Sequence, residues 1–261
     1  MPLEKIPVIL LTGIGIHISY TTPTPPTPVN ERRMRDLVDI NWTLMCMKAS
    51  DFAIRILNTP KWLTSTKTAY WMYAIIEFCI IVAGTMKSTS WSKRVVTLLL
   101  PNGKHPDCIK LTPTTTFATI LIVLGTAIRI WSFREMGRHF TFHVTLLKNH
   151  KLVTTGPYNI VRHPAYTGAI FVLVGNVIWY TARGSWLRES MVYQMKLSLL
   201  FIAPVMLITL LLFSYILRRM PTEDAMMKRE FGKDWDEWAK AVPYRLFPGI
   251  LWLRRSSRSN C

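Results

Sequence analysis

The residues of this 261-residue chain that are best suited to chemistry lie in two polar segments, at 134–167 and 218–261. The first contains the run VRHPAYTG directly before an apolar stretch. Because a proline biases the preceding residue away from the helical conformation, His163 and its neighbour Arg162 are expected on irregular backbone. Such backbone at a membrane edge is tolerated where it lines a cavity. Arg162 and His163 are therefore candidate site residues, although a loop that anchors a helix end among lipid headgroups would use the same residue types.

The second polar segment opens with the run RRMPTED. Thr222 fits the N-cap of a new helix, and Glu223 and Asp224 then fall in its first turn, where the helix dipole favours acids. The dipole accounts for Asp224, so replacing it by Asn is expected to have a mild effect. Arg219 would share a helix face with Glu223, or would serve with Arg218 as a positive flank of the preceding span. Apolar residues spaced as on one helix face follow at Met227, Phe231, Trp235 and Trp238.

Metal and dinucleotide chemistry find little support in the sequence. His139 and His143 stand four residues apart and would share one helix face, like one histidine box of a membrane di-iron enzyme. Such a site needs further ligand clusters, and only His150 and His163 stand nearby. No glycine-rich loop follows a predicted strand, which argues against a Rossmann-type domain. We therefore expect neither a metal nor a dinucleotide fold.

The composition indicates a membrane protein. Half of the residues are hydrophobic and only 18% are charged, below the roughly 25% of an average soluble domain. The net charge is +17. This basic excess would suit nucleic acid, but no nucleic-acid motif is present, and loops beside anionic lipid headgroups explain it better. The lipid bilayer is thus an expected partner, and nucleic acid is not.

The apolar stretches that must position the two polar segments are expected to be helices, because open sheet leaves backbone groups unsatisfied in lipid. Residues 37–57 either lie at the interface or pack inside the bundle, and the Pro/Thr connector at 21–30 is expected to be extended. Arg129 is expected to reach the membrane surface by snorkelling. The expected spans are residues 6–20, 69–86, 114–133, 168–182 and 197–217.

The resulting expectation is an all-α, polytopic integral membrane protein with about five or six transmembrane helices. Residues 1–133 would hold the N-terminal spans, and residues 134–261 would hold the chemistry. A helical hairpin within 168–217 would bring the polar segments to the same side of the membrane. Residues 134–167 and 218–250 are then expected to build one pocket.

From residue 134 to about 252 the chain resembles the isoprenylcysteine carboxyl methyltransferase family. The shared elements are HxLV(x)4Y from His150, RHPxYxG from Arg162, a hydrophobic hairpin, an acidic pair at 223–224 and FG(x)2W(x)2W(x)3VP from Phe231. Their combination in this order is specific, whereas each element alone is a weak signal.

The resemblance implies an endoplasmic reticulum membrane enzyme with a C-terminal helical cofactor pocket. It would use S-adenosylmethionine to methylate the C-terminal carboxylate of farnesyl- or geranylgeranylcysteine in CaaX-processed proteins. Arg219 would hold the substrate carboxylate, and Arg162 and Arg219 would carry catalysis. The chain departs from the family's Glu-Glu pair at Asp224, and Leu146 or His143 stands where relatives place a further polar residue. By position, the cofactor pocket would contain His150, Leu152, Val153, Tyr158, His163, Pro164, Ala165, Tyr166 and Glu223.

The implied reaction suits these residue types, because an α-carboxylate with a pKa of about 3.3–3.7 is already ionised at pH 7 and needs no general base. Three alternatives remain open. A membrane sterol or steroid reductase using NADPH shares the RHPxYxG element, but an acid commonly follows its glycine where this chain has Ala169. A phospholipid N-methyltransferase would have to remove a proton from an amine. A non-enzymatic membrane scaffold could carry the same motif.

Overall fold

A computed structural model of the protein describes residues 2–21, 23, 60–86, 89–100, 103–140, 150–191 and 195–250. The segment at 37–57, His143, Leu146 and all of the 21–30 connector except residues 21 and 23 lie outside the described residues. The structural predictions for them stay predictions.

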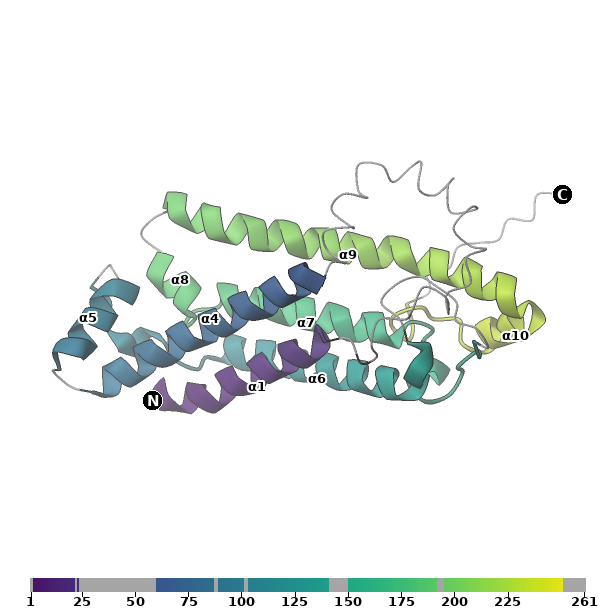
Figure 1. Cartoon of the computed structure of the whole chain (residues 1–261), viewed down its shortest axis with the longest axis horizontal. Coiled ribbons are helices and arrows are strands. Elements are labelled where there is room, and N and C mark those ends of the chain that lie inside the picture. Colours follow the sequence, from purple (N-terminus) through teal and green to yellow (C-terminus); the bar gives the residue numbers. More distant parts are fainter. Residues whose placement is uncertain are drawn as a thin grey trace. The chain divides into compact units, whose positions relative to one another are not determined.

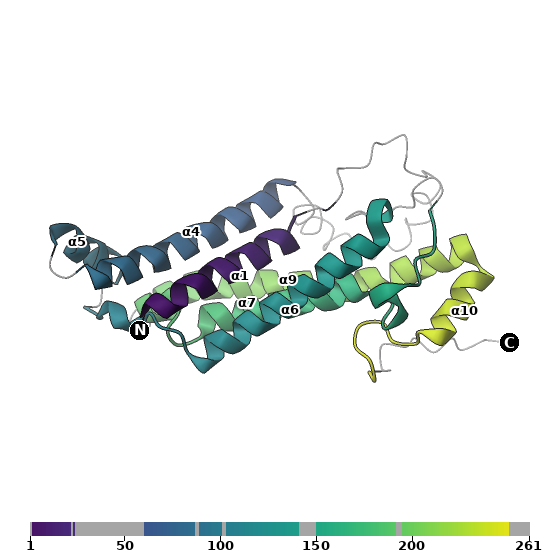
Figure 2. The same cartoon turned by 90° about the horizontal axis from the view of Figure 1, so that it is seen from below.

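Every regular element in the described part of the chain is a helix, which confirms the all-α fold class (Figures 1 and 2). The α-helices are α1 (Lys5–Ser19), α4 (Pro60–Thr85), α5 (Ser90–Leu99), α6 (Pro113–Met136), α7 (Pro164–Thr181), α8 (Trp186–Met191), α9 (Met195–Phe231) and α10 (Lys233–Ala241). Short 3-10 helices are η1 (Pro2–Glu4), η4 (Pro106–Cys108), η5 (Gly137–His139) and η6 (Gly156–Asn159).

Four helical stretches are long and apolar enough to cross a membrane by length and composition. They are Pro2–Ser19, Lys67–Thr85, Pro113–His139 and Pro164–Ser190, and they overlap four of the five spans expected from the sequence. The fifth, at 197–217, lies within α9, whose side chains at 195–205 and 208 are not described. The chain is therefore an all-α protein with the helices that a membrane protein requires.

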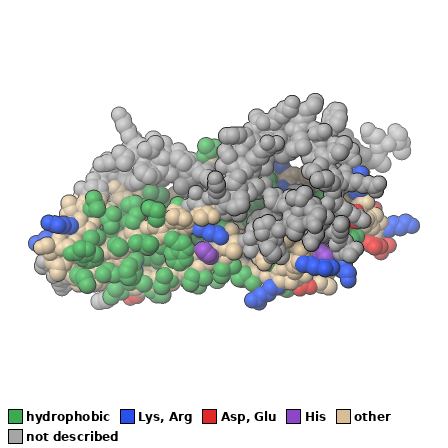
Figure 3. All heavy atoms as spheres, viewed as in Figure 1, with side chains coloured by type: hydrophobic (Ala, Val, Ile, Leu, Met, Phe, Trp, Pro, Cys, Tyr) green, Lys and Arg blue, Asp and Glu red, His purple; other side chains and the backbone are tan. Residues whose placement is uncertain are grey.

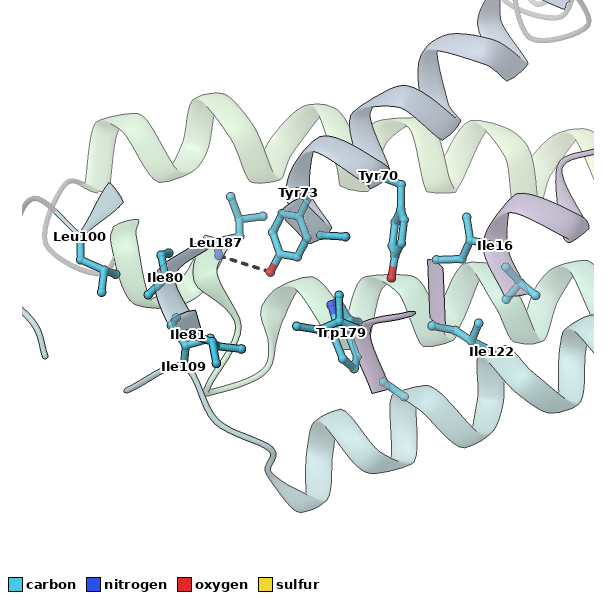
Figure 4. Close-up of a cluster of buried hydrophobic side chains, with 14 residues drawn as sticks. Ile16, Tyr70, Tyr73, Ile80, Ile81, Leu100, Ile109, Ile122, Trp179 and Leu187 are labelled. Carbon is cyan, nitrogen blue, oxygen red and sulfur yellow. Dashed lines mark hydrogen bonds between the residues drawn. The ribbon is translucent and has the colours of Figure 1, made fainter. Parts of the chain in front are cut away.

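Residues 1–20, 59–126 and 170–212 form one compact unit, unit 1, and the remaining residues form unit 2. The core of unit 1 contains buried side chains from α1, α4, α6 and α7, such as Ile16, Tyr70, Ile122 and Trp179 (Figure 4). A Cβ added to Gly175 would lie 2.9 Å from the carbonyl oxygen of Ala118. The glycine thus permits the close approach of two helices that is typical of membrane bundles.

The outer surface of unit 1 is strongly apolar. Many large hydrophobic side chains of α1, α4 and α6 are exposed, among them Leu11, Met72 and Ile120. Hydrophobic side chains form a broad continuous area on the face seen in Figure 3. A surface of this kind in a helical bundle is suited to contact with lipid chains.

A fully buried ion pair joins α1 to α4 inside unit 1. The Lys5 Nζ atom lies 2.8 Å from Glu77 Oε2 and donates to the Gly184 carbonyl at 2.8 Å. The Tyr73 hydroxyl and the Trp186 amide donate to Glu77 Oε1 at 2.9 and 2.8 Å. Burying charge is tolerated when the charges are paired and hydrogen-bonded, so this network fixes α1 in the bundle.

Candidate active site

The RHPAY run lies where the chain enters α7, and α7 begins at Pro164 as the proline predicts. The Arg162 amide donates to the Tyr244 carbonyl and the His163 amide to the Arg245 carbonyl, both at 2.9 Å. The Thr167 hydroxyl continues this pairing with a 2.6 Å bond to the Leu246 carbonyl. The tail after α10 thus holds the irregular backbone that the sequence predicted.

The HxLV(x)4Y element is attached to the end of α6. The Thr155 hydroxyl donates to the Glu135 carboxylate. Gly156 has φ +58° at the start of η6, and a Cβ there would lie 2.8 Å from Glu135 Oε2. A side chain at this position would therefore meet both backbone strain and a clash, which explains the glycine.

The prediction that Thr222 caps a new helix is wrong. Helix α9 runs without interruption from Met195 through Pro221 to Phe231, so no helix begins at residue 222. Proline inside a helix costs about 3 kcal/mol. The buried side chains of Ile216 and Met220, spaced four apart on one face, supply packing that offsets this cost.

Arg219 and Glu223 form the i,i+4 pair that the sequence predicted, now within one continuous helix. Arg219 Nε donates to Glu223 Oε1 at 2.7 Å and Arg219 Nη1 donates to the Tyr215 hydroxyl at 2.8 Å. The Arg219 side chain is 8% exposed. Glu223 Oε1 also accepts from the Tyr166 hydroxyl at 2.6 Å. Contacts within the helix and from α7 therefore fix the orientation of both charged groups.

The helix dipole does not explain Asp224, which is 6% exposed in the interior of α9. Its carboxylate accepts from Arg162 Nη1 at 3.2 Å and from Arg245 Nε at 2.9 Å. His163 Nε2 lies 3.0 Å from Asp224 Oδ1, within hydrogen-bond distance. Burial by itself would raise the pKa of Asp224, but the His163 hydrogen bond and the nearby positive charges lower it below its ordinary value.

His163 lies between the two acids of α9. Its Nε2 faces Asp224, and its Nδ1 lies 3.6 Å from Glu223 Oε2. The Tyr166 ring stacks on the imidazole with the centroids 5.6 Å apart. The acidic pair, the histidine and the tyrosine therefore form one connected polar cluster.

One cavity in unit 2 is lined by both polar segments, as the sequence predicted. Every predicted site residue except Pro164 contributes to its wall; Pro164 begins α7 beside it. The lining residues are Arg129, Met136, His139, Phe140, His150, Lys151, Leu152, Val153, Tyr158, Arg162, His163, Ala165, Tyr166, Arg219, Glu223, Asp224, Met226, Met227, Trp235 and Trp238.

Arg129 lines the cavity. The prediction that its side chain reaches the membrane surface is wrong. Its side chain is buried, and Nη1 donates to the Ala165 carbonyl at 3.0 Å. The guanidinium also lies 4.9 Å from the centroid of the Phe133 ring. The available signal was a lone cation in a long apolar stretch, because such residues commonly mark functional cavities.

His150 and His139 contact each other in the wall, with ring centroids 4.9 Å apart. Burial, with a smaller contribution from His139, lowers the pKa of His150 to about 4, so the imidazole is neutral at pH 7. The Nδ1 atoms of both rings are buried and have no hydrogen-bond partner among the described residues. Within the same residues, no three His, Cys, Asp or Glu side chains are grouped to hold a metal.

The chain is similar to known methyltransferases. A family model described as phospholipid methyltransferase matches residues 113–194. Protein-S-isoprenylcysteine O-methyltransferase B of Arabidopsis thaliana is 28% identical over 129 residues, which cover 49% of this chain and 56% of that protein. The enzyme of the same name from Schizosaccharomyces pombe is 27% identical over 191 residues, covering 72% of this chain and 70% of its own.

The resemblance to the isoprenylcysteine carboxyl methyltransferases is confirmed. A Xenopus laevis protein-S-isoprenylcysteine O-methyltransferase is also similar, at 21% identity over 198 residues. The matched part spans a little over half the length of the Arabidopsis thaliana relative, at 56%. No solved structure matches the chain significantly.

Proposed function

We propose that the chain is a carboxyl methyltransferase that transfers a methyl group from S-adenosylmethionine to the C-terminal carboxylate of a prenylated cysteine. One observation carries this proposal. The residues that the family resemblance assigns to cofactor and substrate come from two distant segments, and all but Pro164 line the same cavity.

The cavity wall has the groups that a nucleoside with an amino-acid tail requires. Leu152 and Val153 offer an apolar surface. The Nδ1 atoms of His139 and His150, which have no partner within the described part of the chain, offer buried polar contacts. The Glu223 carboxylate can accept hydrogen bonds from amino or hydroxyl groups. When bound, S-adenosylmethionine supplies an electrophilic methyl group on a sulfonium. Among the predicted residues, His150 and Glu223 are the ones we assign to holding it.

Arg219 is the residue that we assign to the substrate carboxylate. Its planar guanidinium can grip a carboxylate through two parallel hydrogen bonds, and Glu223 and Tyr215 hold it in place. Orientation of this kind is worth about 7–11 kcal/mol in well-placed reactants. The carboxylate is ionised at neutral pH, so the chain has no proton to remove. We also assign a catalytic role to Arg162, which lines the same cavity and belongs to the catalytic region at 134–261.

The charge of the wall favours an anionic substrate. Four basic side chains, Arg129, Lys151, Arg162 and Arg219, face the cavity together with two acids, Glu223 and Asp224. A site with this excess attracts a carboxylate. We place the enzyme in the endoplasmic reticulum membrane, where the farnesyl or geranylgeranyl chain of a CaaX-processed protein would be accessible from lipid.

Phospholipid N-methylation is the second candidate, because the matching family model carries that description. An amine substrate loses a proton during methylation and therefore benefits from a general base. His150 lines the cavity and is neutral at pH 7, but its pKa of about 4 makes it too weak a base to serve efficiently in that role.

The test is methyl transfer by the full-length protein in membranes. Labelled S-adenosylmethionine would be supplied in three separate reactions, each with one acceptor. The acceptors are N-acetyl-S-farnesylcysteine, the C-terminal amide of the same compound, and phosphatidylethanolamine. We expect label only in the free-acid cysteine derivative, as a base-labile methyl ester. Label in phosphatidylethanolamine alone would establish the second candidate. Absence of transfer to all three, with S-adenosylhomocysteine still binding, would reject both activities.

A further inference from the structure

One end of unit 1 gathers the termini of several helices that are apolar enough to cross a membrane. Lys5 at the start of α1 donates to the Gly184 carbonyl just after α7. Thr112, directly before α6, donates to the Arg183 carbonyl at 3.2 Å. Because the ends of membrane-spanning helices lie at the membrane surface, this end of unit 1 lies at a water–lipid boundary.

Helix α5 is fixed at this end through one of its faces. The Ser92 hydroxyl donates to the Ala83 carbonyl near the end of α4 at 2.6 Å. The Trp186 indole donates to the Leu99 carbonyl at 2.8 Å, and Leu100 is buried. A helix of ten residues is only about 15 Å long and cannot span a bilayer. Helix α5 is therefore a surface helix at the boundary.

The remaining faces of α5 have the residue types of an interfacial helix. Trp91 is 49% exposed and Leu98 is 78% exposed, and their spacing of seven residues places them on the same side of the helix. Arg94 is exposed on the flank of that side, and Lys93 is exposed farther round the helix, on the face nearly opposite Trp91. A helix that lies in a membrane interface places its aromatic and apolar side chains among the acyl chains and its cations among the headgroups.

The surroundings of α5 add to its positive charge. Lys110 and Arg183 are exposed in the neighbouring connections and Arg188 is exposed on α8, whereas Lys104 is paired with Glu189 at 2.7 Å. The exposed acids at this end, among the described residues, are Glu4 and Asp107. The excess of exposed cations therefore complements a negatively charged surface.

We propose that this end of unit 1, the α5 surface, binds anionic phospholipid headgroups. Its members are α5, the connection 103–112 and the turn 182–188. Arg94 contacts the headgroups, Lys93 adds to the positive charge of the surface, and Trp91 and Leu98 enter the boundary of the acyl chains. Helix α5 packs on α4 and on residues 182–188, and this packing holds its cations and its apolar side chains on one surface. The surface therefore recognises the charge of the headgroup and also inserts into the apolar part of the lipid.

The test uses the full chain reconstituted in phosphatidylcholine vesicles that contain brominated phosphatidylserine or the same fraction of brominated phosphatidylcholine. Subtracting the fluorescence of Trp91→Phe from that of the wild type isolates the signal of Trp91. We expect stronger quenching by the brominated phosphatidylserine, and we expect high salt to reduce the difference. Equal quenching by the two lipids would reject the preference for anionic headgroups. An unquenched Trp91 would reject insertion and would leave a protein partner as the occupant of this face.

A charge variant and a matched control complete the experiment. Lys93→Gln with Arg94→Gln should lower the apparent affinity for phosphatidylserine by roughly fivefold for each cation. Lys233→Gln with Lys240→Gln removes two exposed cations from α10 and should leave the affinity unchanged. Equal losses in the two double variants would show an effect of net charge alone and would overturn the assignment. None of these measurements depends on methyl transfer, so their failure is distinct from failure of the proposed function.

Discussion

At the scale of single residues, the site depends on two adjacent acids of α9 that share His163 but otherwise have different partners. Glu223 contacts Arg219 and Tyr166. Asp224 contacts Arg162, His163 and Arg245. The first acid thus pairs with the arginine that we assign to the substrate, and the second pairs with the two arginines Arg162 and Arg245. Substitutions at these two positions should consequently differ in kind.

Arg219→Lys should reduce turnover with the prenylcysteine substrate while leaving S-adenosylhomocysteine binding largely intact. An ammonium keeps the charge but cannot reproduce the guanidinium fork. We expect a loss of roughly 10–100-fold in kcat/KM, equivalent to about 1.4–2.7 kcal/mol. Arg218→Lys is the matched control, since Arg218 is the preceding residue and is exposed. Near-normal kcat/KM in Arg219→Lys would contradict the assignment.

Glu223→Gln should have the opposite effect and weaken cofactor binding first. The amide keeps the shape of the side chain but loses the charge that pairs with Arg219. Isothermal titration of S-adenosylhomocysteine into the purified variant measures this directly. An affinity equal to that of the wild type would remove Glu223 from the cofactor site.

Asp224→Asn should strongly destabilise the protein, in contrast to the mild effect expected from the helix dipole. The change leaves Arg162 and Arg245 without their buried counter-charge and alters the contact with His163. Removing one partner of a buried ion pair costs about 3–5 kcal/mol. Thermal unfolding in detergent, compared with the exposed Asp234→Asn on α10, measures the difference. Equal melting temperatures for the two variants would show that the three contacts contribute nothing.

His150 should make the protein less stable in mild acid. Its pKa is about 4 in the folded protein and about 6.5 in an unfolded chain. Between these values the unfolded state binds more protons, so stability falls as the pH decreases from about 6.5 toward 4. In His150→Asn the melting temperature should depend less on pH over this range, whereas the exposed His105→Asn should behave like the wild type. An unchanged slope in His150→Asn would assign the acid sensitivity to other groups.

At the scale of elements, the tail after α10 is what holds the RHPAY run in position. The Thr167 hydroxyl bonds to the Leu246 carbonyl, and the side chain is buried. Thr167→Val should leave that carbonyl unsatisfied, lower stability by about 1–3 kcal/mol and weaken S-adenosylhomocysteine binding. Thr116→Val is the control, because the exposed Thr116 hydroxyl donates to the Thr112 carbonyl, four residues earlier in the chain. Unfolding and binding should both change for Thr167→Val alone.

At the scale of the whole molecule, the chain combines an apolar helical bundle in unit 1 with a cavity in unit 2 whose wall includes charged side chains. The buried Lys5–Glu77 pair and the Asp224 cluster show the same principle in each unit: charge enters the interior only where a partner meets it. Arg129 follows that principle as well, because a backbone carbonyl accepts from its guanidinium.

The sequence alone determined the elements whose signals are local. Long apolar runs predict helices in lipid because backbone groups there must be satisfied internally, and Pro164 predicts where α7 begins. The spacing of His150, Arg162 and Glu223 indicated the family and the two segments of the cavity. These features depend on the type, order and spacing of residues along the chain, so a single sequence carries them.

The tertiary structure alone decided features that depend on contacts between distant residues. Thr222 is a residue type that favours a helix start, but packing of the buried face of α9 keeps the helix continuous through Pro221. Asp224 has the sequence position of a dipole acid, but Arg245 and Arg162 reach it from elsewhere in the chain. Arg129 has the length to snorkel, but Ala165 offers it an internal acceptor. The physical reason is common to all three: local propensities are worth about 1–3 kcal/mol, and buried packing and charge pairing of similar or larger size override them.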